Sequence, residues 1–151
     1  MIPATAPPCA RSPLHGRRVS ALELCALARV TMLAVAVEVA VRVLPLPVVA
    51  RALRVSLTRP PACAGAATLP ELSRAERRAV RMVRGLMRRW PWGQGTCLRR
   101  SLVVGHVLRR HDPWLRVGVA RTAGDIGAHA WLEIRGVAVG GAGPFLAFEI
   151  P

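Results

Sequence analysis

The sequence predicts an α+β fold, with helices first and a small antiparallel sheet after them. Apolar residues recur at helical spacing as far as about residue 110, and short apolar runs bounded by turn residues follow. A chain of 151 residues is long enough for one domain with a modest core. We therefore expect a single compact unit.

Arginine dominates the charge of the chain. There are 22 basic residues against 8 acidic ones, a net charge of +14, and every basic residue is arginine. The lack of lysine excludes Schiff-base chemistry, a P-loop phosphate lysine and a serine–lysine dyad. Such a charge attracts acidic peptides, nucleic acid or anionic lipid, but it does not identify a reaction. We interpret most of the arginines as solvated helix faces, and keep an arginine-rich nucleic-acid or membrane-surface binding module as an alternative.

Three regions follow from the composition. Residues 1–18 are rich in proline and arginine without periodicity, which predicts a disordered lead. Residues 19–67 are predicted to form an apolar helical arm that ends in a linker rich in proline, alanine and glycine. Residues 68–151 are predicted to form the domain that carries the chemistry.

The apolar arm is the one stretch that raises the question of a membrane. Glu23, Arg29, Glu38 and Arg42 interrupt its apolar run, and the longest charge-free piece is much too short to span a bilayer. Two packed helices are therefore predicted, with peripheral membrane contact kept as the alternative. These helices are expected over about Ala21–Leu44 and about Val48–Leu57.

A second amphipathic segment follows the linker. Ser73 and Glu76 have the spacing of a capping box, and apolar residues after them recur at helical spacing. A helix is therefore predicted from about Ser73 to Arg89, with its arginines largely on the other faces. No aromatic stacking set or zinc-finger pattern accompanies these arginines, so we expect a scaffold helix and no nucleic-acid partner.

Cys97 is the candidate nucleophile. Thr96 can cap a helix from Cys97 to about Arg110, which makes the thiol the first helical residue. Unpaired backbone N–H groups and the positive end of the helix dipole favour a thiolate at that position. Arg99 and Arg100 add positive potential nearby.

The strands that follow carry the candidate base. Strands are predicted over Leu115–Ala120 and Ala128–Ile134, joined by a loop over Arg121–Gly127, with a return strand from Val137. A tight turn at Arg135–Gly136 is expected to connect the last two strands.

Geometry selects His129 among the four histidines. His106 lies nine places along the cysteine's helix and is rotated by about 180° away from the thiol. His111 is about 20 Å along the axis, which is beyond hydrogen-bond reach, and His15 lies in the lead. His129 opens the second strand and is the histidine that remains available.

Four segments together resemble a known family. They are Thr96–Leu102 (TCLRRSL), Leu108–Arg110 (LRR), Leu115–Val119 (LRVGV) and Ala128–Glu133 (AHAWLE). In combination they resemble the transglutaminase-like cysteine peptidases of lasso-peptide biosynthesis, the B-type leader peptidases, over roughly Arg77–Val139. The resemblance implies a papain- or transglutaminase-like core in which a nucleophile helix packs on a small antiparallel sheet.

The same resemblance implies a function and partners. Cys97 would be the nucleophile and His129 the base of a cysteine peptidase that removes the leader of a ribosomally made precursor peptide. A small leader-recognition protein and an ATP-dependent macrolactam-forming lasso cyclase would be its partners.

The third catalytic residue does not match the family's pattern. The family has an acid about a dozen positions beyond the histidine, where this chain has Gly141. A two-residue turn at Arg135–Gly136 would likewise bring only residues 140–142, Gly-Gly-Ala, beside His129. Glu133 shares a strand face with the histidine but lies about 13 Å away. Asp125 and Glu149 are the remaining acids that could fold back, and Glu149 is our choice.

Further site residues complete the expectation. The backbone N–H of Cys97 and the side chain of Gln94 would stabilise the oxyanion, and Trp131 would line the substrate site, unless it is an ordinary core aromatic. The missing acid motivates an alternative, a catalytically impaired relative that binds the precursor or scaffolds the cyclase.

The cysteines indicate the compartment and exclude metal chemistry. They are far apart in sequence, with no metal-ligand spacing and no disulfide framework, which favours a reduced, cytoplasmic protein with no metal and no cofactor. They are Cys9, Cys25, Cys63 and Cys97.

Overall fold

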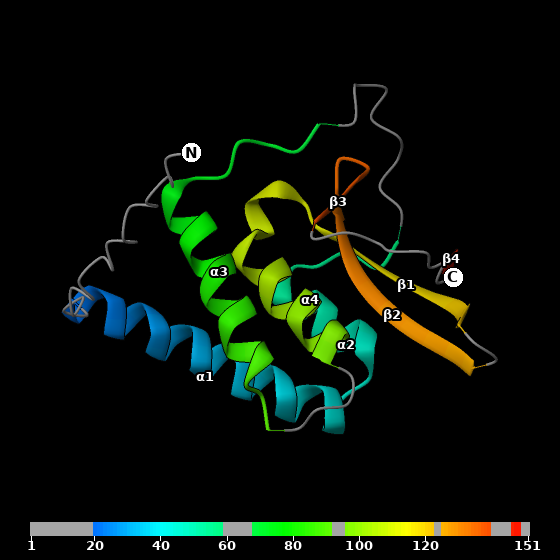
Figure 1. Ribbon diagram of the computed structural model, residues 1–151, viewed down its shortest axis with the longest axis horizontal. Helices are drawn as coiled ribbons and strands as arrows, with labels where there is room; N and C mark the ends of the chain where they lie inside the picture. The colour runs from blue at the N-terminus through cyan, green and yellow to red at the C-terminus, as the bar shows by residue number, and fades with distance from the viewer. Residues whose placement is uncertain (1–19, 59–67, 92–95, 123–124, 140–145, 149–151) are drawn as a thin grey trace, which may run out of the picture.

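The computed structural model describes residues 20–58, 68–91, 96–122, 125–139 and 146–148. Within these residues four helices precede a four-stranded sheet, as the α+β expectation requires (Figure 1). The helices are α1 (Ala21–Val43), α2 (Leu46–Leu53), α3 (Arg74–Arg88) and α4 (Thr96–Val107), with a 3-10 turn, η1 (Arg109–His111). The strands are β1 (Trp114–Thr122), β2 (Asp125–Ile134), β3 (Val137–Val139) and β4 (Leu146–Phe148).

The sheet is antiparallel throughout, in the order β3-β2-β1-β4. The predicted turn at Arg135–Gly136 is confirmed: φ is 50° and 79° at these two residues, as a two-residue hairpin turn with positive φ requires. The predicted loop over Arg121–Gly127 is wrong, because the pairing of β1 with β2 continues to Thr122 and Asp125. Glycine and polar residues hid this extension, which forms through backbone pairing rather than through an alternating apolar pattern.

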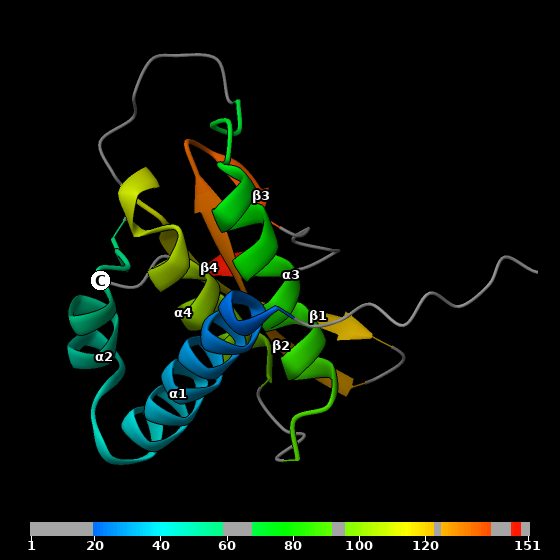
Figure 2. The same ribbon diagram turned by 90° about the vertical axis from the view of Figure 1, so that its left-hand side faces the viewer.

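Helix α4 lies at the centre of the molecule. It contacts α1, α2 and α3 as well as β1 and β2, so helices and sheet enclose it (Figures 1 and 2). Leu102, Val103 and Leu108 are fully buried, and Gly105 packs against Val55. Helix α4 therefore begins near Cys97 and runs through the middle of the core.

The arm shares this core with the rest of the chain. Val37, Val49 and Val55 belong to the same buried cluster as Val83 and Leu132. After α2 the chain continues beside the sheet, where Ser56 forms a parallel bridge with Trp114. The helical arm and the sheet are thus one packed unit.

The predicted helices of the arm form, but the end of the second is wrong. Helix α2 begins at Leu46 because Pro45 and Pro47 fit a first helical turn, where no N–H partner is needed. It ends at Leu53 rather than Leu57, because Arg54 takes the left-handed conformation with φ 57°. Helix α1 is capped by a box of Ser20 and Glu23.

The other two helices differ in how well the sequence predicted them. The capping box of Ser73 and Glu76 is confirmed at the start of α3. Helix α4 already includes Thr96, so Cys97 is its second residue, and it ends at Val107 instead of Arg110. The chain then tightens into η1 and leaves through Asp112 at φ 49° before Pro113, which a continuing helix does not accommodate.

Helix α1 meets the length and hydropathy of a membrane span, with 23 residues and a mean hydropathy of 2.1 in its most apolar window. The buried side of α1 belongs to the core of the protein, through Val30, Ala34 and Val37. As one apolar helix near the N-terminus it is compatible with a soluble protein.

Candidate active site

Cys97 lies in the first turn of α4, half-buried and packed against the core. Ser101 follows it by one helical turn and is therefore on the same face of the helix. The Ser101 hydroxyl is buried and donates a 3.0 Å hydrogen bond to the carbonyl oxygen of Ala130 on β2. The face of α4 that carries Cys97 is thus the face that meets β2.

Two contacts fix the register of α4 along β2. Ser101 bonds to Ala130, and Gly105 packs against Leu132, whose Cδ2 would lie 3.3 Å from a Cβ at the glycine. Four helical residues rise about 6 Å and two strand residues about 6.6 Å, so helix and strand advance together. By the same spacing, one turn further back along α4 Cys97 corresponds to Ala128, the residue before His129.

His129 lies on the opposite face of β2 from Ala130 and Leu132, and strand alternation therefore points its side chain away from the face that packs on α4. Side chains alternate along a strand, and His129 accordingly shares its face with Trp131, whose ring centroid is 6.1 Å away at an interplanar angle of 18°. Its partner on β1 is Gly118, which has no side chain to pack against the imidazole. Burial, and then the positive charge of Arg100, lower the pKa of His129. The imidazole is therefore within electrostatic reach of Arg100 on α4, and both effects favour its neutral form.

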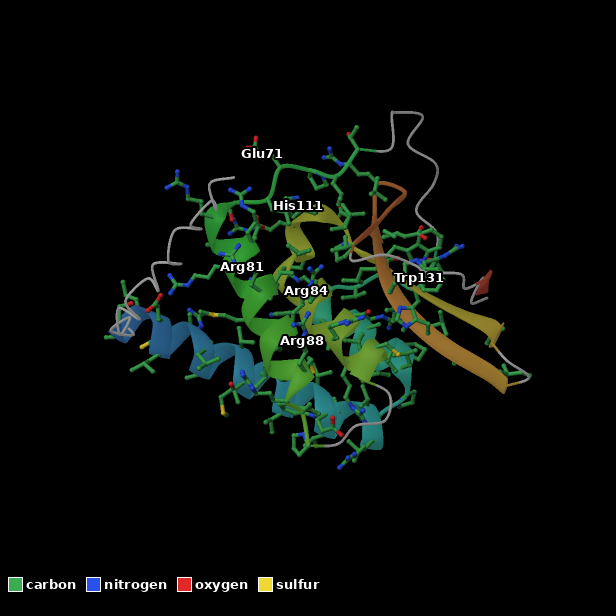
Figure 3. The ribbon with its side chains drawn as sticks, viewed as in Figure 1. Glu71, Arg81, Arg84, Arg88, His111 and Trp131 are labelled. Carbon is green, nitrogen blue, oxygen red and sulfur yellow. The ribbon has the colours of Figure 1, made fainter. Side chains whose placement is uncertain are left out.

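Trp131 and Glu133 extend this row along the strand. The Trp131 indole N–H donates to Glu133 at 3.1 Å, and Glu133 pairs with Arg116 of β1 at 3.6 Å. Arg116 in turn lies 4.4 Å from the ring centroid of Trp114. Trp131, expected in the substrate site, is buried and held in this row; it lies beside the sheet in Figure 3.

Arg99 points into the interior and not toward open solvent. Its guanidinium lies 2.5 Å from the carboxylate of Glu38 on α1, which also pairs with Arg42 at 2.7 Å. The indole N–H of Trp90 donates to the same carboxylate at 3.2 Å. Glu38 is 2% exposed. The positive potential expected from Arg99 near Cys97 is therefore offset by a carboxylate, and Arg100 is the charge that acts on the site.

Sequence reasoning missed the roles of Ser101 and Glu38. In the sequence, Glu38 was interpreted only as a charge that interrupts an apolar run. A single acidic residue among apolar positions is also the signal of a buried ion pair. Ser101 could have been found from its spacing of four residues after the cysteine, on the apolar side of the helix.

The other described histidines lie away from Cys97. The His106 Nδ1 is 3.4 Å from the carbonyl oxygen of Leu53, and burial, more than the nearby charges of Arg109 and Arg54, lowers its pKa. His111 is 3.1 Å from Glu76, beyond the opposite end of α4. This agrees with the sequence argument that set both aside.

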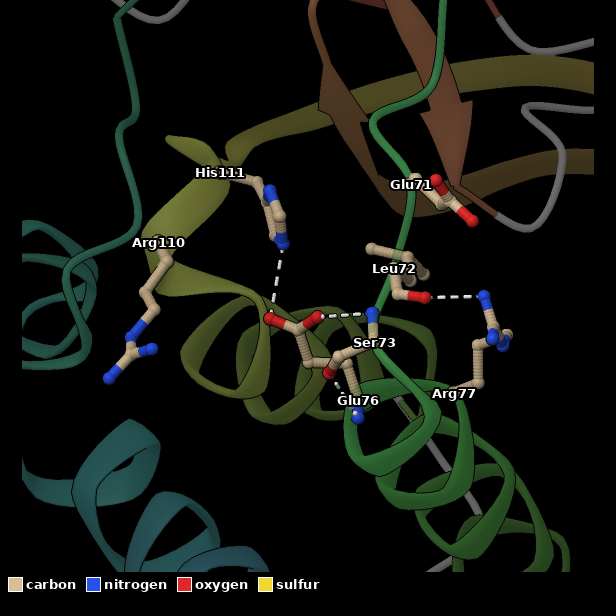
Figure 4. A pocket seen from close by; sticks show the side chains of 7 residues that line it. All are labelled: Glu71, Leu72, Ser73, Glu76, Arg77, Arg110 and His111. Atoms are coloured by element: carbon tan, nitrogen blue, oxygen red, sulfur yellow. Dashed lines mark hydrogen bonds and ion pairs between the residues drawn. The ribbon is translucent and has the colours of Figure 1, made fainter.

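A surface pocket of about 420 Å³ surrounds that last pair (Figure 4). The backbone N–H of Ser73, and then its hydroxyl, lower the pKa of Glu76, to which His111 adds a smaller effect. The pocket lies at the start of α3, and neither Cys97 nor His129 lines it. Its lining residues are Glu71, Leu72, Ser73, Glu76, Arg77, Arg110 and His111.

Several expected site residues lie outside the described residues. These are Gln94, Glu149 and the Gly-Gly-Ala segment 140–142, and the side chain of Asp125 is likewise not described. Among the side chains that are described, no group of three His, Cys, Asp or Glu could hold a metal ion. Cys25 and Cys97 are both free thiols.

Comparison with known proteins identifies the family to which this sequence is similar. The family described as the transglutaminase-like superfamily matches residues 31–150, which include Cys97, His129 and most of the helical arm. No curated protein and no solved structure matches the chain significantly. The match agrees with the observed fold, a helix packed on a small antiparallel sheet. The chain therefore belongs to the transglutaminase-like superfamily.

Proposed function

We propose that this protein is a cysteine peptidase that removes the leader from a ribosomally synthesised lasso-peptide precursor. The family match supports the cysteine-hydrolase part, because this superfamily includes cysteine peptidases. The observation that supports the proposal is that the face of α4 that carries Cys97 packs on β2, the strand that carries His129. The four sequence segments that resemble the B-type leader peptidases support the choice of substrate.

The proposed reaction is acyl transfer in two steps. His129 takes the proton of the Cys97 thiol as the sulfur attacks the scissile carbonyl carbon. The negative oxygen is held by the backbone N–H of Cys97, which has no helical acceptor in a first turn. His129 gives its proton to the leaving nitrogen, so the amide bond breaks and a thioester remains. His129 then takes a proton from water as the water attacks the thioester carbonyl. The carbon–sulfur bond breaks, the acid leaves, and His129 returns the proton to the sulfur, which regenerates the thiol and the neutral imidazole.

The electrostatics around His129 support its role as base. Burial and Arg100 lower the pKa of His129, which favours the neutral imidazole, the form that can accept a proton. We propose Glu149 as the third member that orients the imidazole and Gln94 as a second oxyanion donor.

The setting follows from the proposed substrate. A leader-recognition protein would deliver the precursor, the peptidase would cut it, and an ATP-dependent lasso cyclase would close the released core in the cytoplasm. A short precursor reading frame and a cyclase gene beside this gene would support the pathway, whereas their absence would favour another substrate for the same chemistry.

The direct test is cleavage of a precursor by the purified protein, with the recognition protein present and products identified by mass spectrometry. We expect release of the leader by the wild type and loss of at least about a thousandfold in rate for Cys97→Ala and His129→Ala. The matched control is Cys25→Ser, which removes an exposed thiol on α1 and should leave the rate unchanged.

Thiol reactivity separates the active enzyme from the impaired relative. An active site predicts that iodoacetamide labels Cys97 faster than Cys25, although Cys25 is the more exposed thiol. Equal or slower labelling of Cys97, together with intact precursor, would instead favour a protein that binds the precursor without cutting it.

A further inference from the structure

The outward side of α1 is apolar along its length. Met32, Val35, Val39 and Val43 are 70%, 41%, 55% and 69% exposed, and their spacing of three, four and four residues puts them on one stripe. Monomeric soluble proteins seldom expose a continuous apolar surface of this kind, and such a surface marks an interaction site. The stripe continues across the turn into α2 with exposed Leu44 and Val48. We call this set the apolar stripe.

Helix α3, which packs beside α1, presents a row of arginines. Arg77, Arg81, Arg84 and Arg88 are exposed and recur every three or four residues, so they share one side of the helix. Figure 3 labels Arg81, Arg84 and Arg88 along α3. The carboxylates of Glu23, Glu38, Glu76 and Glu133 are engaged by other cationic side chains. None of the ion pairs described here joins one of these carboxylates to the arginine row.

The apolar stripe and the arginine row belong to one rigid part of the molecule. Arg78 of α3 forms an ion pair with Glu23 of α1, and the two helices lie side by side in both views (Figures 1 and 2). Arg29 and Arg42 are also exposed at the borders of the stripe on α1 itself. An apolar face edged by cations is the pattern of a helix that lies in the plane of a membrane interface.

The inward side of α1 shows why the helix would lie on a bilayer and not cross it. Glu38 is 2% exposed and pairs with Arg99 of α4, so insertion of α1 would break a buried ion pair and strip the core of Val30 and Val37. Surface binding needs only the residues that are already exposed.

We propose that the apolar stripe and the arginine row form a docking surface for an anionic lipid bilayer. The stripe would rest at the level of the acyl-chain boundary, while the arginines contact lipid phosphates. Nucleic acid would account for the arginines but leave the apolar stripe uncovered. A second copy packed through this surface would bring two arginine rows toward each other, which is repulsive. This surface is independent of the proposed peptidase reaction.

Vesicle co-sedimentation of the full chain tests the proposal. We expect the wild type to bind vesicles of mixed phosphatidylcholine and phosphatidylglycerol, to bind phosphatidylcholine alone much more weakly, and to be released by salt. The double variant Arg84→Gln/Arg88→Gln should lose about tenfold in partition onto anionic vesicles. The double variant Met32→Gln/Val39→Gln should lose at least about tenfold on the same vesicles.

Matched controls keep the test specific. Arg109→Gln/Arg135→Gln removes two exposed arginines that lie on η1 and in the turn between β2 and β3, outside the arginine row. This variant should change the partition by less than about twofold if position, and not net charge, controls binding. Circular dichroism must show the same melting midpoint for every variant that is compared.

Four results would overturn the proposal. They are equal binding to neutral and anionic vesicles, an equal loss in the control variant, retention after carbonate extraction as for a spanning helix, and binding to duplex or single-stranded nucleic acid with none to vesicles. Precursor cleavage measured on the same variants in lipid-free solution reports separately on the peptidase proposal.

Discussion

Helices α3 and α4 are neighbours that differ in what surrounds them. Each is tied to α1 by an ion pair, but the two pairs lie in different environments. The side chains of Arg99 and Glu38 are 14% and 2% exposed, whereas those of Arg78 and Glu23 are 42% and 20% exposed. Removing one partner from a buried pair leaves an uncompensated charge in the core, while an exposed pair is replaced by water. The same chemistry should therefore differ severalfold in its effect on stability.

The largest effect is expected from these two ion pairs. Arg99→Ala should lower the free energy of unfolding by about 3 kcal/mol, because Glu38 stays buried with fewer partners. Arg78→Ala should lower it by less than about 1 kcal/mol. Urea denaturation followed by circular dichroism gives both values.

A double variant checks the cause of that difference. Glu38→Leu/Arg99→Met replaces the buried charges by apolar side chains and should recover most of the stability lost in Arg99→Ala. Equal losses for Arg78→Ala and Arg99→Ala would mean that burial does not set the strength of these pairs.

The next effect concerns one glycine in each helix. A Cβ on Gly105 of α4 would lie 2.6 Å from Val55 Cγ2, so Gly105→Ala should destabilise the protein by about 1–3 kcal/mol. A Cβ on Gly85 of α3 meets nothing within 4 Å, so Gly85→Ala should stabilise it by about 0.5–1 kcal/mol. The two melting midpoints should therefore move in opposite directions. A higher melting midpoint in both variants would show that the Val55 side chain can move to make room for the new methyl group.

A third effect concerns the pH dependence of cleavage. Arg100 lowers the pKa of His129, so Arg100→Gln should raise that pKa, and the acid limb of kcat/KM should move to higher pH by up to about one unit. Arg81→Gln removes an equal charge from α3 and should leave the limb in place. An unchanged pH profile of kcat/KM in Arg100→Gln would show that Arg100 does not act on the group that titrates in the acid limb.

The smallest effect is expected at the start of α3. The pKa of Glu76 is lowered from its ordinary value of 4.5, so its carboxylate stabilises the fold above that pH and loses this contribution as the pH falls through the lowered pKa. Because Glu76 is largely solvated, Glu76→Gln should remove less than about 0.5 kcal/mol of this acid sensitivity. Urea denaturation at acid and at neutral pH measures this difference in the free energy of unfolding. A difference of several kcal/mol between wild type and Glu76→Gln would show that the pair of Glu76 with His111 is stronger than expected for an exposed pair.

The contrast between the two helices also explains what the sequence could predict. Helix α3 has one buried face and a capping box, so its apolar periodicity predicted the helix and the capping box predicted where it begins. Helix α4 is enclosed, and its apolar residues lie on several sides, so its end at Val107 had to come from the tertiary structure. The hairpin extension to Thr122 and Asp125 was hidden for a related reason, because backbone pairing leaves no side-chain pattern there.

For the candidate site, the sequence predicted which helix or strand carries each residue, but not the direction in which each side chain points. Sequence spacing placed Cys97 at the start of a helix and His129 on a strand beside it, but not the register that Ser101 and Gly105 set. It also could not show that Arg99 turns inward to Glu38 while Arg100 acts on the imidazole, since adjacent helical residues point in different directions and only packing selects between them.

The bridge between Ser56 and Trp114 has a practical consequence. It anchors the end of the arm to the first strand, and the two stretches on either side of residues 59–67 contribute side chains to a common interior. A gene divided between Thr58 and Thr68 would therefore yield two polypeptides, each with a half-formed interior that only the other can complete. Co-expressed in one cell they should reassemble, which would make this protein a split reporter whose reconstitution reads out the proximity of two attached partners.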